Sequence, residues 1–159
     1  MATRGVLYVH SALPAVSPHI EWAVAGVLGM PVRFDWQPQP VSPGAVRTES
    51  AWAGEPGCAS RLTSVLRGWP IRFEVTEDPS SGCDGERYAF TPTLGLFHAS
   101  TSANGDLVVP ENRLRHLLAS GEDARSAIGL LLGEPWDAEL DTFRHAGDGT
   151  PVRWLHEVV

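Results

Sequence analysis

The sequence predicts an α+β fold, because its first 78 residues follow the order strand, helix, strand, strand, helix, strand. Alternation of apolar and polar residues indicates the strands, and apolar residues three and four positions apart indicate the helices. This order is that of a split βαβ, ferredoxin-like sandwich, with two helices on one sheet face and the other face open. The expected elements are strands at residues 3–11, 32–36, 46–52 and 71–76 and helices at 17–29 and 59–69.

The expected elements of this core have clear local signals. Residues 3–11 are apolar on both faces, which favours a central strand. The following helix begins at Ser17 and Pro18, because proline suits the first helical turn, where its missing N–H has no partner to lose. Residues 32–36 and 46–52 alternate in hydrophobicity and flank a proline-rich connection, so they are expected to form a long-looped hairpin.

The second half of the chain is expected to extend this core with a further hairpin, C-terminal helices and a final strand. Asn104 and Gly105 are a standard hairpin turn signal. We expect one domain over residues 1–159, with a core at 1–78 and an elaboration at 79–159 packed on it. The expected elements are strands at 87–91, 94–100, 107–109 and 152–158 and helices at 110–119, 121–132 (capped by Ser120) and from Pro135 onward.

The composition excludes several classes of function. All 12 basic residues are arginine, so the chain has no lysine for Schiff-base, general-base or phosphate-loop chemistry. The net charge is −7, and the basic residues gather only at Arg113 and Arg115. Nucleic-acid binding needs a basic stripe, and anionic lipid repels an acidic protein, so we expect neither partner.

Cysteine usage and the N-terminal residues indicate a cytoplasmic protein. Cys58 and Cys83 are the only cysteines, and they form neither a CxxC motif nor a disulfide framework. The N-terminal residues lead directly into a strand without a charged and apolar signal segment, and no apolar run is long enough to span a membrane. We expect reduced thiols and no cofactor.

Motifs along nearly the whole chain are specific to one family. They are TRGVLYVHSA (residues 3–12), PHIEWAVAG (18–26), DGERY (84–88), LGLFH (94–98), PWD (135–137), FRHAG (143–147) and VRWLH (152–156). In these motifs the chain resembles an actinobacterial domain-of-unknown-function family of small cytoplasmic proteins. Members are often encoded beside genes of type II fatty-acid synthesis, so the resemblance implies a link to fatty-acid metabolism and no defined activity.

Three residues around the first strand–helix connection form a candidate ligand site. His10 ends the first strand, His19 opens the first helix, and Glu21 lies in its first turn. These positions converge in a βα unit, where free N–H groups favour an anion over a metal. The alternative is that the two histidines form hydrogen bonds with backbone groups of the loop and bind no ligand. We expect no metal.

Arginines and tryptophans of the expected strands are further candidates. Arg33, Arg47 and Arg72 could contact an anionic ligand. Trp36 and Trp52 are expected on one face of the hairpin, as a partner-binding aromatic patch or as part of the core. The acidic residues at positions 137, 139 and 141 are expected to form a solvated face.

The leading functional hypothesis is a non-enzymatic binding or regulatory protein that holds a protein partner or dimerises through the sheet face or an edge strand. One alternative is a small-molecule binder for an acyl thioester or another anion, which an apolar cavity with an arginine would favour. Another is a small hydrolase or isomerase using His10, His19 and Glu21, which would need all three in one cleft. The chain carries no coherent catalytic motif, so the sequence favours binding over catalysis.

Overall fold

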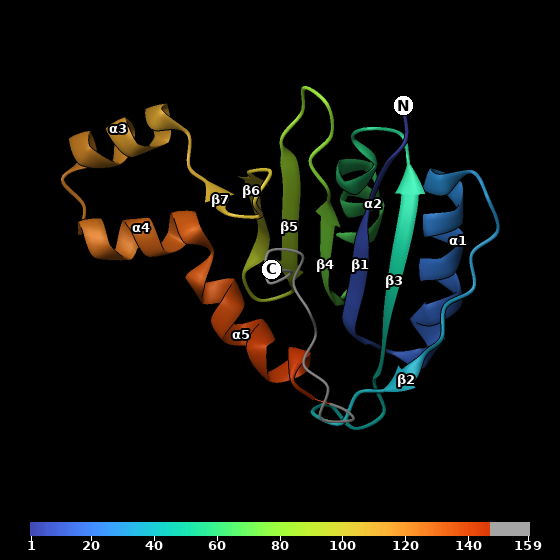
Figure 1. The fold of residues 1–159 in the computed structure, drawn as a ribbon. Coiled ribbons are helices and arrows are strands. Elements are labelled where there is room, and N and C mark those ends of the chain that lie inside the picture. The colour runs from blue at the N-terminus through green and yellow to red at the C-terminus, as the bar shows by residue number, and fades with distance from the viewer. Residues whose placement is uncertain (147–159) are drawn as a thin grey trace.

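The structure, a computed structural model, describes residues 1–146 and shows an α+β protein with a seven-stranded antiparallel sheet and five α-helices (Figure 1). The strand order across the sheet is β2-β3-β1-β4-β5-β6-β7. The strands are β1 (Thr3–Ala12), β2 (Gln37–Pro38), β3 (Val46–Gly54), β4 (Arg72–Glu77), β5 (Gly85–Thr91), β6 (Gly95–Thr101) and β7 (Leu107–Val108). The helices are α1 (Ser17–Leu28), α2 (Cys58–Leu66), α3 (Glu111–Ser120), α4 (Ala124–Leu132) and α5 (Glu134–Arg144), with a 3-10 turn at Pro14–Val16.

Most elements of the first half agree with the sequence prediction. β1 lies in the middle of the sheet between β3 and β4, as its two apolar faces predict. α1 begins at Ser17 with Pro18 in its first turn and ends at Gly29, whose φ of 70° is a left-handed conformation that glycine adopts without steric cost.

The strand predicted at residues 32–36 is wrong. This segment forms no strand, and only Gln37 and Pro38 pair with β3. The reason is a competing partner on α1: the carboxylate of Glu21 accepts hydrogen bonds of 3.0 Å from the N–H of Phe34 and from Trp36 Nε1. These bonds tie the segment to the helix, so its alternating residues do not extend the sheet.

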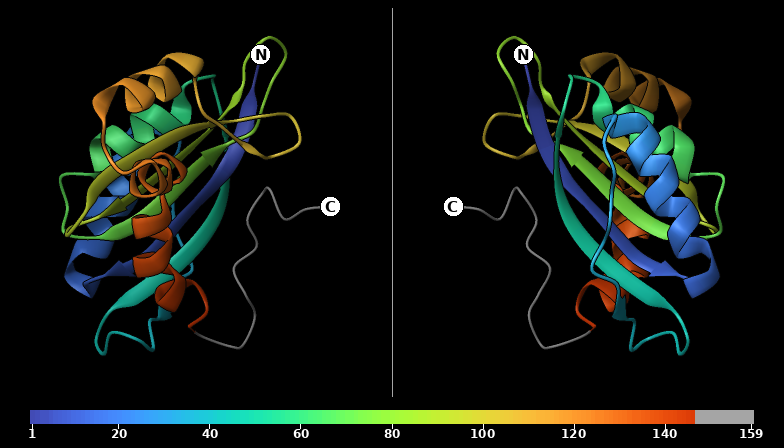
Figure 2. Two further views of the ribbon diagram at one scale, coloured as in Figure 1. Left: turned by 90° about the vertical axis from the view of Figure 1, so that its left-hand side faces the viewer. Right: turned by 90° about the vertical axis from the view of Figure 1, so that its right-hand side faces the viewer.

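Helices cover both faces of the sheet. α1 and α2 pack on one face and α5 packs on the other, against β1 and β5 (Figure 2). The expectation of one open face is therefore wrong where α5 lies. The side chains between the sheet and α1 and α2 are almost entirely apolar, and the fully buried ones include Leu7, Val9, Ile20, Leu62, Leu66, Phe73 and Val75.

The C-terminal helices differ from the prediction most at the start of α4, and elsewhere by single residues. α3 ends at Gly121, with φ 72°, and α4 begins only at Ala124. Asp123, and not Ser120, caps α4, because its carboxylate accepts a hydrogen bond from the N–H of Ser126. The final strand predicted at residues 152–158 lies outside the described residues.

Candidate functional site

The outer edge of β3 is open along most of its length. β2 pairs only with Val46 and Arg47, so the rest of β3, residues 48–54, has no second strand beside it among residues 1–146. Proteins normally protect such an edge with a proline, a lysine, a bulge or a covering segment. Residues 48–54 contain neither proline nor lysine. No strand among residues 1–146 pairs with this side of the stretch, and the Ala51 carbonyl accepts a hydrogen bond of 3.3 Å from Ser50 Oγ, so the edge can still pair with another extended chain.

Hydrogen bonds on the other side of β1 show which way the backbone of β1 points. The N–H of Asp78 donates to the carbonyl of Arg4, at 2.8 Å. The N–H of Val6 donates to Thr76 Oγ1, at 3.1 Å. Arg4 and Val6 thus direct their backbone groups toward β4. Because this direction alternates along a strand, the backbone groups of Gly5 face β3.

The pairing register of β1 with β3 shows which residues of β3 point their backbone groups toward β1. Gly5 pairs with Trp52, so the backbone groups of Trp52 point back to β1. The intervening residues of β3 point their N–H and C=O groups away from the sheet; these are Glu49, Ala51 and Ala53. The open edge is thus three outward-facing residues long, which is enough to pair with a short extended segment.

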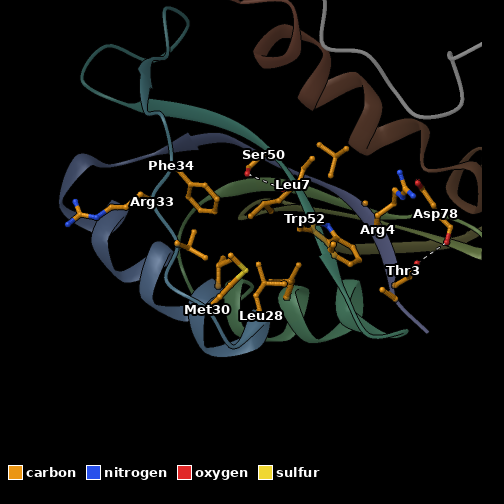
Figure 3. Close-up of a pocket in the computed structure, with 18 of the residues that line it drawn as sticks. Thr3, Arg4, Leu7, Leu28, Met30, Arg33, Phe34, Ser50, Trp52 and Asp78 are labelled. Atoms are coloured by element: carbon orange, nitrogen blue, oxygen red, sulfur yellow. Dashed lines mark hydrogen bonds between the residues drawn. The ribbon is translucent and has the colours of Figure 1, made fainter.

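An apolar cavity of about 720 Å³ lies beside this open edge. We call it the edge pocket (Figure 3). It opens where residues 30–34 turn toward α1 instead of pairing with β3. Its apolar wall comes from five different segments and consists of Leu7, Val24, Leu28, Met30, Val32, Phe34, Trp52 and Leu62. A volume of this size is typical of sites that bind small molecules or apolar anchors of a partner.

Trp52 forms the inner wall of the edge pocket and carries an unused hydrogen-bond donor. Its side chain is 6% exposed. Its Nε1 has no hydrogen-bond partner among the described residues. The indole lies against Gly5, where a Cβ would come within 2.6 Å of the ring. A Cβ there would also overlap with the Thr76 carbonyl oxygen, so glycine makes room for both the indole and the β4 backbone.

Charged groups lie at the two ends of the edge pocket. Figure 3 shows the Arg33 side chain directed away from the cavity at one end, and Arg4 beside Asp78 at the other. Burial raises the pKa of the Asp78 carboxyl, while the charge of Arg4 acts in the opposite direction. The cavity is thus apolar in its middle and charged at its ends.

The structure does not bring together the three residues predicted to share a ligand site. His10 is buried and lies 2.6 Å from Glu74. His19 is exposed and its ring stacks on Trp69, at 5.3 Å between ring centroids. Glu21 holds the segment after α1, as described above. Each residue has its own set of partners, so no cleft joins the three among residues 1–146.

His10 belongs instead to a buried group of charged residues between the sheet and α5. We call this group the ionic cluster; its members are His10, Glu74, Arg87, Asp137 and Arg144. Glu74 is 0% exposed and contacts His10 and both arginines. Asp137, half exposed on α5, contacts both arginines at 2.7 and 2.8 Å. Two carboxylates thus balance two guanidinium groups.

The ionic cluster favours the charged forms of Glu74 and Arg144. Burial alone would raise the pKa of the Glu74 carboxyl, but the hydrogen bond and charge of His10, and then those of Arg144, lower it to about 2. Burial alone would lower the pKa of Arg144, but its hydrogen bonds to Glu74 and Asp137 raise it. A charge-balanced cluster of this kind helps to fix the position of α5 on the sheet, together with the apolar packing of Leu140.

Arg47 and Arg72, two of the predicted ligand contacts, form contacts with α5 and with the residues directly after it. Arg47 donates to the carbonyl of Ala146. Arg72 pairs with Glu139 at 3.2 Å and lies over the Phe143 ring. Because Asp137 and Glu139 face arginines of the sheet, the expectation of a solvated acidic face is wrong for these two residues.

The two hairpin tryptophans are part of the apolar core. Trp52 is a buried member, and Trp36 is partly buried and packs against the same cluster. Trp52 thus belongs to the core and at the same time lines the edge pocket, so the prediction of a partner-binding role for these two residues stays open. The sequence missed the edge pocket, because the pocket exists only where the predicted strand at residues 32–36 does not form.

Comparison with known proteins places this fold in a family. The chain is an α+β protein with an antiparallel sheet, an edge pocket and a buried ionic cluster. Residues 6–157 match the model of the family described as "Protein of unknown function (DUF3145)", and the chain belongs to that family. No curated protein and no solved structure matches the chain. No helix among residues 1–146 is long and apolar enough to cross a membrane.

Proposed function

We propose that this protein is a non-enzymatic binding protein that holds an extended segment of a protein partner along the open edge of β3. The observation that carries the proposal is the combination of an unpaired strand edge with an apolar cavity directly beside it. Backbone pairing at Glu49, Ala51 and Ala53 would supply affinity. An apolar side chain of the partner, placed in the edge pocket, would supply specificity.

The geometry of a β-strand determines which partner residues enter the pocket. Side chains alternate between the two faces, so every second residue of an added strand lies on the side of Trp52 and α1. The other residues lie on the opposite face, beside Ala51 and Ala53, which are small and exposed. We therefore expect a partner segment that is apolar at alternate positions.

We also infer that residues 1–78 form a ferredoxin-like unit with an incomplete second strand. The order β2-β3-β1-β4, with α1 and α2 on one face, agrees with a split βαβ sandwich. In such a sandwich a full second strand would occupy the edge of β3. Here the second strand is two residues long, and an added strand of a partner would take the place of the missing part.

The test removes one outward-facing N–H of the open edge. Ala51→Pro deletes this donor at a position where an edge strand tolerates proline. The control, Ala51→Thr, keeps the N–H and suits a strand. Tagged wild type and both variants are purified from the native host and analysed by native mass spectrometry. We expect a stoichiometric partner on wild type and Ala51→Thr and at least about tenfold less on Ala51→Pro. Equal capture by all three would overturn the proposal.

A second candidate is a small-molecule binder, favoured by the volume and apolar lining of the edge pocket. The ligand would be an apolar molecule such as an acyl chain, with an anionic group near Arg33 or Arg4. Ser50 lines the pocket, so Ser50→Leu adds a side chain to the cavity. A small molecule would be lost with Ser50→Leu and kept with Ala51→Pro. A partner strand would be weakened by both substitutions.

A further inference from the structure

The helices α3 and α4 form an arm that the other residues of the range 1–146 bury only poorly. We call residues 111–132 the α3–α4 arm. α3 lies away from the sheet in Figure 1, and α4 connects it to α5. Within the arm, the buried residues are Leu117, Ala127 and Gly129. Helices of 10 and 9 residues are marginal in water when they lack tertiary packing. The arm therefore needs a further surface to pack against.

Several large apolar side chains of the arm are exposed among its polar residues. Leu118 is 78% exposed, and three other large apolar residues of the arm, Leu114, Ile128 and Leu130, are also exposed. Contiguous exposed apolar surface in a globular protein marks an interaction site. A groove of about 590 Å³ runs between the two helices, and Leu117 and Leu130 line it. The arm thus presents exposed apolar side chains beside a groove that is lined by both polar and apolar residues.

Two charges of opposite sign line this groove. Arg113 comes from α3, and Glu122 comes from the turn before α4. Neither forms an ion pair with another residue in the part of the chain that the structure describes. The neighbouring charges are already used: Arg115 pairs with Glu111, and Asp123 caps α4. Arg113 and Glu122 are available to a partner.

The charge of the arm differs from that of the rest of the chain. The arm contains three arginines and three acidic residues, so its net charge is zero. The whole chain has a net charge of −7, which the remaining residues must carry. Two copies of an acidic protein repel each other over most of their surfaces. The arm is a surface through which two copies can approach without that cost.

We propose that the α3–α4 arm binds the same arm of a second copy of this chain. A two-fold interface places the same patch on both sides and therefore must be self-complementary. The arm meets this condition in two ways. Leu118 can enter the groove of the partner subunit, and Arg113 can face Glu122 of the partner subunit. The two arms together form a four-helix bundle with the exposed leucines inside it. This interface is independent of the β3 edge.

The first test compares two equally exposed apolar residues on different helices. Leu118→Glu places a charge in the proposed interface, and Trp22→Glu, at a side chain 80% exposed on α1, is the control. The mass in solution is measured by sedimentation over a range of protein concentrations. We expect wild type and Trp22→Glu at twice the chain mass of 17.2 kDa and Leu118→Glu at the chain mass. A monomeric wild type at all concentrations, or a dimeric Leu118→Glu, overturns the proposal.

A charge exchange tests the pairing of the two copies. Arg113→Glu and Glu122→Arg each place like charges opposite each other in a homodimer, so each variant is expected to be monomeric. Mixing the two variants restores both opposite-charge contacts, and native mass spectrometry is expected to show a heterodimer. A mixture that stays monomeric while wild type is dimeric would show that the arm does not pair in this way.

Discussion

The two faces of the sheet hold their helices by different means. On one face, α1 and α2 pack against apolar side chains of β1 and β4, such as Leu7 and Phe73. On the other face, Leu140 and Trp136 of α5 pack against a small apolar cluster of β5 and β6, and Glu74, Arg87 and Arg144 form a buried ionic cluster beside it. The apolar face tolerates changes of shape that keep its volume. The ionic face depends on each charge having its partner, because a single uncompensated buried charge is costly.

The largest expected effect comes from removing the central carboxylate of the ionic cluster. Glu74→Ala leaves two buried arginines with one carboxylate fewer, so we expect the free energy of unfolding to fall by about 3–5 kcal/mol. Urea denaturation measures this loss. The control, Glu49→Ala, changes an exposed glutamate of β3 and is expected to have an effect within about 0.5 kcal/mol. A loss below about 1 kcal/mol for Glu74→Ala would show that the cluster does not fix α5.

Shortening a buried side chain on the apolar face gives a loss of unfolding free energy to compare with that of Glu74→Ala on the ionic face. Leu62 is fully buried on α2. Leu62→Ala removes buried apolar volume and is expected to cost about 2–5 kcal/mol by the same denaturation experiment. Val65→Ala, on the exposed side of α2, is the control and should cost less than about 1 kcal/mol. Equal losses for the two variants would contradict the described packing of α2.

The pH dependence helps to distinguish the two faces, because Glu74, whose pKa is strongly lowered, lies on the ionic face. The pKa of Glu74 is lowered from 4.5 to about 2 in the folded protein, so this carboxylate stabilises the fold above its unfolded pKa. The stabilisation, about 3 kcal/mol from this shift, is lost as the pH falls through 4.5 toward 2. We expect the difference in unfolding free energy between wild type and Glu74→Gln to be largest near neutral pH and to shrink in acid. A difference that is constant with pH would contradict this result.

The smallest expected effect belongs to the partly exposed ion pair at the edge of the ionic face. Arg72 and Glu139 are 28% and 21% exposed and lie 3.2 Å apart. Water screens such a pair, so Glu139→Gln is expected to cost about 0.2–1 kcal/mol in urea denaturation. A cost as large as that of Glu74→Ala would mean that burial does not explain the difference between the two positions.

The same comparison shows why the sequence predicted one face better than the other. The apolar residues of α1, α2, β1 and β4 recur at helical or strand spacing, so a local window reveals them. The ionic cluster joins residues 64 and 70 positions apart, such as Glu74 with His10 and with Arg144. Alternation alone places these polar residues on the solvent side of the strands. No local pattern signals that α5 covers them.

The candidate site was missed for a related reason. The alternation at residues 32–36 predicts a strand, and a strand there would close the edge of β3. Glu21 prevents this by accepting hydrogen bonds from Phe34 and Trp36. The glutamate itself was recognised as a candidate, but as a ligand contact, since its partners lie 13 and 15 positions away. The segment is thus held to α1 by Glu21, and it contacts β3 through a hydrogen bond from Thr48 Oγ1 to the carbonyl of Asp35 and not as a paired strand.

Hydrogen exchange of the β3 amides in the complex purified from the host tests the central proposal most directly. An added strand would protect the outward-facing N–H groups of Glu49, Ala51 and Ala53, while that of Trp52, which points to β1, would change little. Protection limited to these alternate residues, and absent in the free protein, is the expected result. Unchanged exchange along β3 in a stoichiometric complex would contradict the proposal that this edge holds the partner.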